Sequence, residues 1–272
     1  MSLPVPAGSI RKLLREIESS GRGEHLLAVG GATELAPVLR QQFLRGRADP
    51  GAVRLGGPEG ADVYVHVGAG DLTEEDEAAL RRARRACMPV IAVDTRPAGD
   101  DVAIPYVLAT DVVRAGAGES FPLEAIARAI ATRLGEDGAP LAARVPLLRE
   151  AVCDRLIALL ARKNGLFAAA TWIPGPDLPV LTLNELRLVL RLAQAYGADD
   201  VRERLPELTV TLGASFGLRA LARELLDVVP VARWALKGAV AYGGTRVLGE
   251  AARGRFELAP RRQRAAAAPA GP

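Results

Sequence analysis

The chain is poor in the residues that most often carry chemistry or cross-link small folds. Its 272 residues include two cysteines and two histidines, and aromatic residues make up only 4%. Cys87 and Cys153 are far apart in the sequence, so their spacing predicts neither a disulfide framework nor a metal site. Both lie in stretches with a helical pattern, and we expect both to be buried as small apolar groups. The core must therefore consist mainly of leucine, valine and alanine.

Residue patterns for enzyme chemistry are also scarce. His25 and His66 have no cysteine or carboxylate at ligand spacing, and we find no plausible serine–histidine–aspartate arrangement. We therefore expect no catalytic residue and no metal, and we interpret both histidines as packing residues. The formal net charge of +3 is too small, without a clustered basic patch, to indicate nucleic-acid binding.

Long apolar runs are missing as well. A membrane-spanning helix needs about 20 apolar residues with few charges. The apolar stretch from Pro206 to Phe256 has its longest uncharged run at Leu208–Leu218, and Arg219 ends it. The first residues contain no apolar segment typical of a secretory signal. We expect a cytoplasmic protein.

The first half of the chain alternates between strand and helix patterns. Apolar runs predict strands over 25–31, 62–68, 89–94 and 107–113. Between and around them, helices are predicted over 10–19, 33–44, 74–87 and 122–134. Ser9 and Thr33 are expected caps, and Thr73–Asp76 forms a capping box. This alternation predicts an α/β fold with a parallel sheet and flanking helices.

The second half contains helix patterns alone. Gly135–Pro140 is a polar, glycine-rich break and the expected domain boundary. A helix is predicted from Pro146 to a stop at Asn164–Gly165, and a capping box at Thr182–Glu185 opens another that closes at Gly197. Two apolar helices, split at Val229–Pro230, follow. The predicted organisation is an N-terminal helix (1–22), an α/β domain (23–138), a helical domain (139–257) and a disordered basic tail (258–272).

Several short sequence blocks follow one another in the helical half, and their order is informative. They are Leu178–Asn184, Leu212–Ala220, Val229–Pro230, Trp234–Gly238, Ala241–Arg246 and Gly249–Glu250. Over roughly residues 147 to 257, this order resembles the domain of unknown function 697, which occurs in YcjF-like proteins and behind GTPase domains of the Era type. The resemblance implies a helical domain and carries no known reaction.

The first half resembles an Era-like P-loop GTPase domain in outline but lacks its functional residues. The phosphate loop G-x-x-x-x-G-K-[ST] needs glycine, lysine and a hydroxyl where a count from Gly30 gives Leu35, Ala36 and Pro37. Glu34 would add negative charge beside the phosphates. The expected Mg²⁺ motif near residues 57–60 has no aspartate, and residues 94–97 lack the guanine-specificity pattern. We predict a degenerate domain with no cofactor.

A few positions retain some prospect of ligand binding. A phosphate could rest on the helix after Gly30, Gly31 and Thr33, because helix N-termini carry free N–H groups. Asp94 and Asp111 are expected at the carboxyl ends of strands, where parallel sheets bind ligands. The alternative is that both aspartates cap loops or helices.

The last predicted helix carries candidates for interactions. Ala235, Ala239 and Gly243 repeat at a spacing that lets two helices approach closely. The charged side chains of Lys237, Arg246 and Glu250 are the interaction candidates, with Arg246 and Glu250 able to pair one turn apart.

The combined pattern favours a non-catalytic pseudo-GTPase scaffold joined to a helical interaction domain, with a protein partner or self-association. One alternative is peripheral association with the inner face of the cell membrane through the apolar C-terminal helices. Another is a nucleotide-binding regulator with a residual site.

Overall fold

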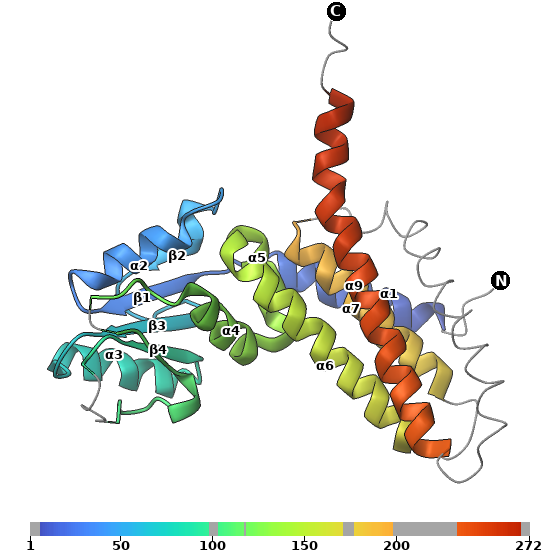
Figure 1. Ribbon diagram of the computed structural model, residues 1–272, viewed down its shortest axis with the longest axis horizontal. Coiled ribbons are helices and arrows are strands. Elements are labelled where there is room, and N and C mark those ends of the chain that lie inside the picture. The colour runs from blue at the N-terminus through green and yellow to red at the C-terminus, as the bar shows by residue number, and fades with distance from the viewer. Residues whose placement is uncertain (1–5, 98–102, 117, 171–176, 198–232, 268–272) are drawn as a thin grey trace, which may run out of the picture. The chain divides into compact units, whose positions relative to one another are not determined.

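The computed structural model describes residues 6–97, 103–116, 118–170, 177–197 and 233–267 (Figure 1). The chain divides into two compact units. The α/β unit comprises Gly23–Arg155, and the helical unit comprises Met1–Arg22 together with Leu156–Pro272. The division falls within one helix rather than in the glycine-rich stretch at 135–140. The first of the two predicted apolar helices, which precedes Val229–Pro230, lies outside the described residues.

The α/β unit is built on a five-stranded parallel sheet, as the alternating pattern predicted (Figure 1). The strand order is β2-β1-β3-β4-β5. The strands are β1 (Leu27–Gly31), β2 (Val53–Leu55), β3 (Val63–Gly68), β4 (Val90–Asp94) and β5 (Val112–Arg114). The central strands are almost continuously buried, which is typical of a parallel sheet covered on both faces.

Helices cover the two faces of this sheet. Alternate strand residues Ala28, Tyr64 and Ala92 pack with Ala79, Leu80 and Ala83 of α3 (Glu74–Arg85). The opposite face of β1, β2 and β3 is contacted by α2 (Leu35–Phe43), as Figure 1 shows. β4 and β5 are contacted by α4 (Leu123–Leu134), and α5 (Gly138–Arg144) follows it.

Two strand predictions need correction. β2 was not predicted, because it has three residues and only its first is buried, so its sequence shows no clear period. The strand predicted over 107–113 is shorter and begins later. A 3₁₀ turn occupies Ala109–Asp111, and β5 begins at Val112.

The prediction that both cysteines are buried is wrong for Cys87. Cys87 follows the C-terminal end of α3, where it is exposed and has a φ of 52°. It is therefore not the buried apolar group that we expected. Cys153 is fully buried, as predicted.

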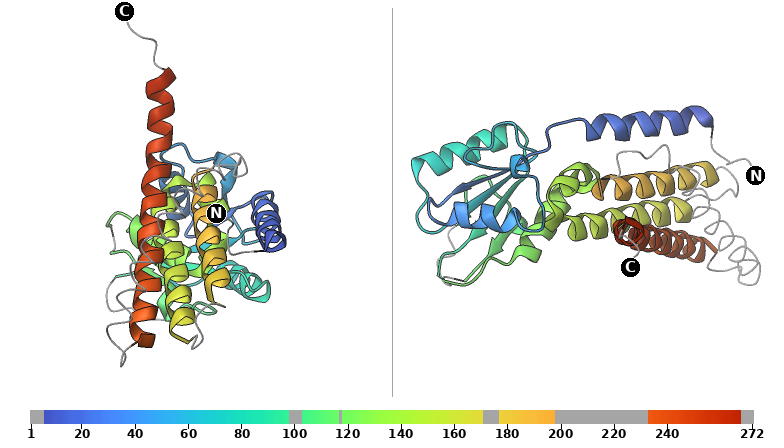
Figure 2. Two further views of the ribbon diagram at one scale, coloured as in Figure 1. Left: turned by 90° about the vertical axis from the view of Figure 1, so that its right-hand side faces the viewer. Right: turned by 90° about the horizontal axis from the view of Figure 1, so that it is seen from above.

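The helical unit consists of long helices lying beside one another (Figure 2). They are α1 (Ala7–Gly21), α6 (Arg149–Ala170, which the division between the units cuts after Arg155), α7 (Asp177–Ala195) and α9 (Arg233–Ala267). α1 begins at Ala7 without a side-chain cap, so Ser9 lies inside the helix rather than capping it. α9 runs on to Ala267, into the stretch predicted to be disordered.

Asn164 and Gly165 do not end a helix, although their sequence predicted a stop. α6 continues to Ala170. Asn164 is fully buried, and its Nδ2 donates to Thr245 Oγ1 of α9 at 2.9 Å. A Cβ atom on Gly165 would lie 3.2 Å from the carbonyl oxygen of Gly238. The pair therefore marks the place where α6 and α9 approach closely.

The capping box predicted at Thr182–Glu185 is also wrong. α7 begins five residues earlier in the sequence, at Asp177, and both residues are buried inside the helix. The predicted end at Gly197 is confirmed, because α7 ends at Ala195 and Gly197 has a φ of 71°.

The close-packing stripe predicted on the last helix makes no close contact with the described part of the chain. Ala235 and Ala239 are exposed, and a Cβ atom on Gly243 would have no neighbouring atom within 4 Å among the described residues. The close contacts are instead made by Gly238 against α6 and by Gly249, whose Cβ would lie 2.7 Å from Ile157. No helix in the described part of the chain is long and apolar enough to cross a membrane.

Candidate functional site

The carboxyl edge of the sheet between β1 and β3 is where this topology would place a ligand. In open parallel sheets, ligands bind beyond the carboxyl ends of strands, where the direction of the crossovers reverses. Here the chain leaves β1 toward β2 on one side, and β3 lies on the other. Gly30 and Gly31 end β1, and they pair with His66 and Val67 of β3.

The backbone of the chain itself closes this position at Gly31. The amide of Ala32 donates to the carbonyl oxygen of Val67 at 2.8 Å. Gly31 has a φ of 97°, and a Cβ atom there would overlap the Val67 carbonyl oxygen and lie 2.9 Å from the Val67 nitrogen. Glycine is required at position 31 because β1 turns tightly against β3. The next amide, that of Ala32, already donates a hydrogen bond within the sheet.

Gly30 is enclosed in a similar way. A Cβ atom on Gly30 would lie 2.5 Å from the Tyr64 hydroxyl and 2.7 Å from the carbonyl oxygen of Gly56. Burial, with a smaller contribution from Asp76, raises the pKa of Tyr64 to about 12, so this hydroxyl is neutral at physiological pH. Both glycines therefore serve close packing within the sheet.

Thr33 does not cap α2, which corrects the prediction. It is exposed in a turn, and the N-cap position is held by Glu34, which makes no side-chain cap. The amides of Leu35 and Ala36 donate to the carbonyl oxygen of Ala32 at 3.1 and 2.9 Å. The first amides of α2 are thus satisfied by the preceding turn.

Asp94 lies at the predicted place, as the last residue of β4, and is 4% exposed. Its carboxylate accepts from Arg96 Nε and NH2, both at 2.8 Å, and from the Arg96 amide at 3.1 Å. These bonds from Arg96 hold the pKa of Asp94 below its usual range. The carboxylate stays ionised, and a guanidinium already covers both of its oxygens.

Asp111 does not lie at a carboxyl end. It precedes β5, in the 3₁₀ turn, and β5 pairs with β4 from Val112 opposite Ala92. Asp94 and Asp111 are therefore at different ends of neighbouring strands and do not form one site. Asp111 is buried and pairs with Arg133 of α4, with NH2 at 2.5 Å from Oδ2.

His66 is a feature that sequence reasoning treated as packing alone. It is 1% exposed, and neither ring nitrogen has a hydrogen-bond partner among the described residues. Its Nδ1 lies 3.9 Å from Asp76 of the α3 capping box. Burial lowers the pKa of His66, against the opposing effect of the Asp76 charge. No sequence signal distinguished this unsatisfied imidazole from an ordinary core residue.

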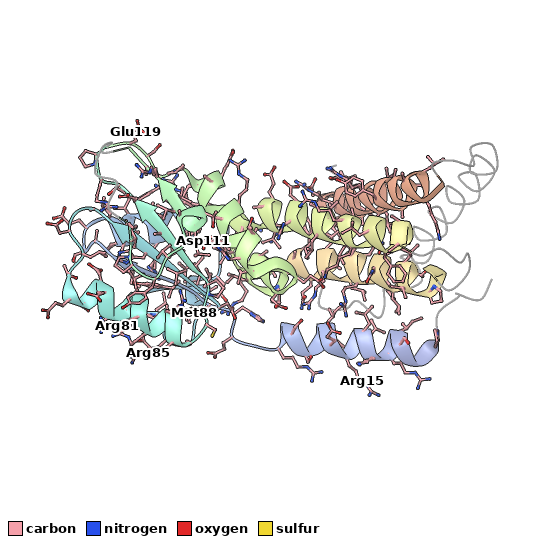
Figure 3. All side chains as sticks on the ribbon, turned by 90° about the horizontal axis from the view of Figure 1, so that it is seen from below. Arg15, Arg81, Arg85, Met88, Asp111 and Glu119 are labelled. Carbon is pink, nitrogen blue, oxygen red and sulfur yellow. The ribbon has the colours of Figure 1, made fainter. Side chains whose placement is uncertain are left out.

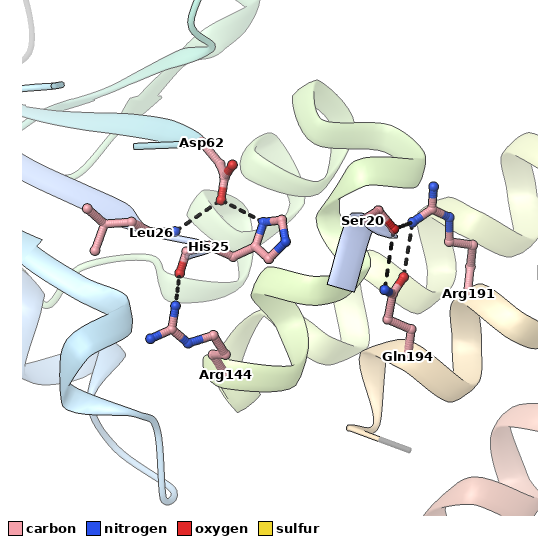
Figure 4. A network of polar contacts seen from close by, with 7 residues as sticks. All are labelled: Ser20, His25, Leu26, Asp62, Arg144, Arg191 and Gln194. Atoms are coloured by element: carbon pink, nitrogen blue, oxygen red, sulfur yellow. Dashed lines mark hydrogen bonds and ion pairs between the residues drawn. The ribbon is translucent and has the colours of Figure 1, made fainter. Parts of the chain in front are cut away.

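Two networks of polar contacts, one in each unit, join segments that are distant in the sequence (Figure 4). In the α/β unit, Asp62 accepts from His25 Nδ1 and from the Leu26 amide, both at 3.0 Å. Arg144 donates to the His25 carbonyl oxygen at 2.6 Å and binds Asp49. The helix α5 is thereby tied to the start of β1.

In the helical unit, the second network joins α1 to α7. Arg191 donates to the Ser20 hydroxyl at 2.7 Å, and Gln194 donates to the Ile17 carbonyl oxygen at 3.2 Å.

The interaction candidates of α9 are dispersed. Lys237 is half-buried and has a contact partner. Arg246 donates to the Tyr242 hydroxyl at 3.4 Å rather than to Glu250, which is exposed. The three side chains do not form one cluster of contacts among the described residues.

Within the described ranges, no group of His, Cys, Asp and Glu residues is arranged to hold a metal ion. Comparisons with protein-family models, curated proteins and solved structures found no match.

Proposed function

We propose that the protein is a non-catalytic pseudo-GTPase scaffold: an α/β unit without nucleotide chemistry, joined to a helical interaction unit. The main support is the contact between the Ala32 amide and the Val67 carbonyl at the crossover reversal. A phosphate loop needs free amides and a cation at this place. Here the amide is occupied, and the sequence supplies Ala36 and Pro37 where lysine and hydroxyl are needed.

The charge at the sheet edge gives further support. Asp94 is neutralised by Arg96 and is not available to hold Mg²⁺ or a guanine base. Glu34 is exposed next to the turn after β1, where it would repel a polyphosphate.

The helical unit carries the proposed contact with a protein partner or a second copy. Leu166 near the end of α6 is 74% exposed, and Val247 of α9 is 59% exposed. These two apolar side chains are the ones that we propose to contact the partner.

A titration of the full chain with GTP and Mg²⁺ tests this proposal. We expect no saturable heat in isothermal titration calorimetry and no thermal shift with any nucleotide. Glu34→Lys removes the repulsive charge, and Glu24→Lys, at another exposed glutamate, serves as its control. Micromolar binding by the native chain that Glu34→Lys alters and Glu24→Lys does not would contradict the proposal.

A further inference from the structure

The outer face of α1 carries a compact group of cations. Arg11, Lys12 and Arg15 are exposed, and together with Gly8 they border a space of about 330 Å³ that is largely open to solvent. Figure 3 shows Arg15 pointing away from the neighbouring helices of its unit. Arg11 and Arg15 are one turn apart, about 6 Å along the axis, with Lys12 between them. We call these four residues the basic face of α1.

The other faces of α1 are already occupied within the helical unit. Leu13 and Ile17 are each 4% exposed and form its apolar side. Glu16, which could pair with Lys12 one turn away, instead accepts from Arg187 of α7 at 2.9 and 3.2 Å. The described part of the chain offers no hydrogen bond or ion pair to Arg11, Lys12 or Arg15. No carboxylate of the described residues is bound to the basic face.

This concentration of charge has a cost for the helix. Like charges three or four residues apart destabilise a helix by a few tenths of a kcal/mol per pair. A bound anion would replace this repulsion between the cations with attraction. Arginine presents a planar fork of donors that fits the oxygens of a phosphate, and lysine adds a compact point charge. Gly8 leaves space beside them, because no atom of the described part of the chain lies within 4 Å of where its side chain would be.

We propose that the basic face of α1 binds a phosphate group, carried either by a small molecule or by a lipid headgroup. The site lies on a different element from the closed edge of the sheet, and it does not depend on the α/β unit being free of nucleotide. It gives the helical unit a ligand of its own, which goes beyond a scaffold role.

The test compares native chain with two variants that lose the same charge. Arg11→Gln/Lys12→Gln/Arg15→Gln removes the basic face, and glutamine preserves helix propensity. The control is Arg45→Gln/Arg84→Gln/Arg85→Gln, at exposed arginines outside α1. Circular dichroism and urea unfolding establish that each variant is folded.

The probes are inorganic pyrophosphate, followed by calorimetry, and vesicles of phosphatidylcholine with and without phosphatidic acid, followed by flotation. We expect binding that the α1 variant weakens at least about tenfold, because charge-assisted hydrogen bonds are lost, and that the control retains. Pyrophosphate binding indicates a small-molecule source, and binding to phosphatidic acid vesicles alone indicates a lipid. The proposal is overturned if neither probe binds, or if the control loses as much as the α1 variant.

Discussion

The α/β unit and the helical unit satisfy their buried polar groups in different ways. At the sheet edge, Asp94 is neutralised by Arg96, two residues further along the chain. In the helical unit, Asn164 of α6 donates to Thr245 of α9 and accepts from Asn184 of α7 at 2.8 Å. The buried carboxylate at the sheet edge is matched by a local contact, whereas the buried amide between the helices is matched by residues that are distant in the sequence.

The packing at the sheet edge does not depend on a bound ligand. The sheet needs Gly30 and Gly31 for packing whether or not a ligand is present. Asp94 is already paired with Arg96, so its charge is not available to a ligand. In the helical unit, the buried side chain of Asn164 meets its side-chain partners only when α6, α7 and α9 are assembled.

The largest effect is expected from Gly31→Ala, which tests the closure of the sheet edge. The new methyl group would overlap the Val67 carbonyl oxygen. Gly46→Ala is the matched control, since Gly46 has a φ of 73° but its Cβ atom would meet no atom of the described residues within 4 Å. We expect Gly31→Ala to lower the free energy of unfolding by about 3 kcal/mol more than the control, measured by urea titration. Equal losses would mean that backbone strain alone requires Gly31.

A somewhat smaller loss is expected from Arg96→Met. It leaves the buried carboxylate of Asp94 without its guanidinium, and breaking a buried pair in this way costs about 3 kcal/mol. Asp94→Asn/Arg96→Met removes both charges, so it should restore part of the loss in urea unfolding. A double variant as unstable as Arg96→Met would argue against the pair.

In the helical unit, Thr245→Val removes the acceptor for Asn164 while preserving shape. We expect a loss of about 1 to 3 kcal/mol, because the buried Asn164 amide keeps an unsatisfied donor. Combining it with Asn164→Leu should cost less than the sum of the single changes. Strict additivity in thermal unfolding would show that the two side chains are not coupled.

The smallest effect concerns the pH dependence of the α/β unit. Because the pKa of His66 is lowered in the folded state, the unfolded chain binds the proton more readily. Stability is therefore full above the ordinary histidine value of 6.5 and falls as the pH drops below it. His66→Phe should flatten the acid slope between pH values just above and below that value. His25→Phe, at the other histidine, tests whether the slope belongs to His66; a slope that only His25→Phe removes would contradict the assignment.

Sequence reasoning succeeded where local chemistry decides the structure. The Thr73–Asp76 capping box is present, with the Asp76 amide donating to Thr73 Oγ1 at 3.1 Å. The strand at 90–94 was predicted from its continuous apolar run. At the edge of the sheet, the position of Asp94 was predicted, but its neutralisation by Arg96 was not.

The failures are concentrated where contacts between distant residues decide. Thr182–Glu185 has the pattern of Thr73–Asp76, but burial inside α7 overrides it. Asn164–Gly165 reads as a helix end because its role depends on α9, far along the chain. The prediction that Thr33 caps α2 failed for a local reason. The first amides of α2 donate to the carbonyl oxygen of Ala32 instead of to a side chain.

The most direct test of the closed sheet edge is a nuclear magnetic resonance titration with GTP and Mg²⁺, followed at the amides of Gly31, Ala32 and Thr33. We predict that these signals do not shift saturably at ligand concentrations up to about 1 mM, which corresponds to a binding free energy weaker than about −4 kcal/mol. We also predict slow hydrogen exchange at the Ala32 amide. Saturable shifts of all three signals in the micromolar range would contradict a closed edge.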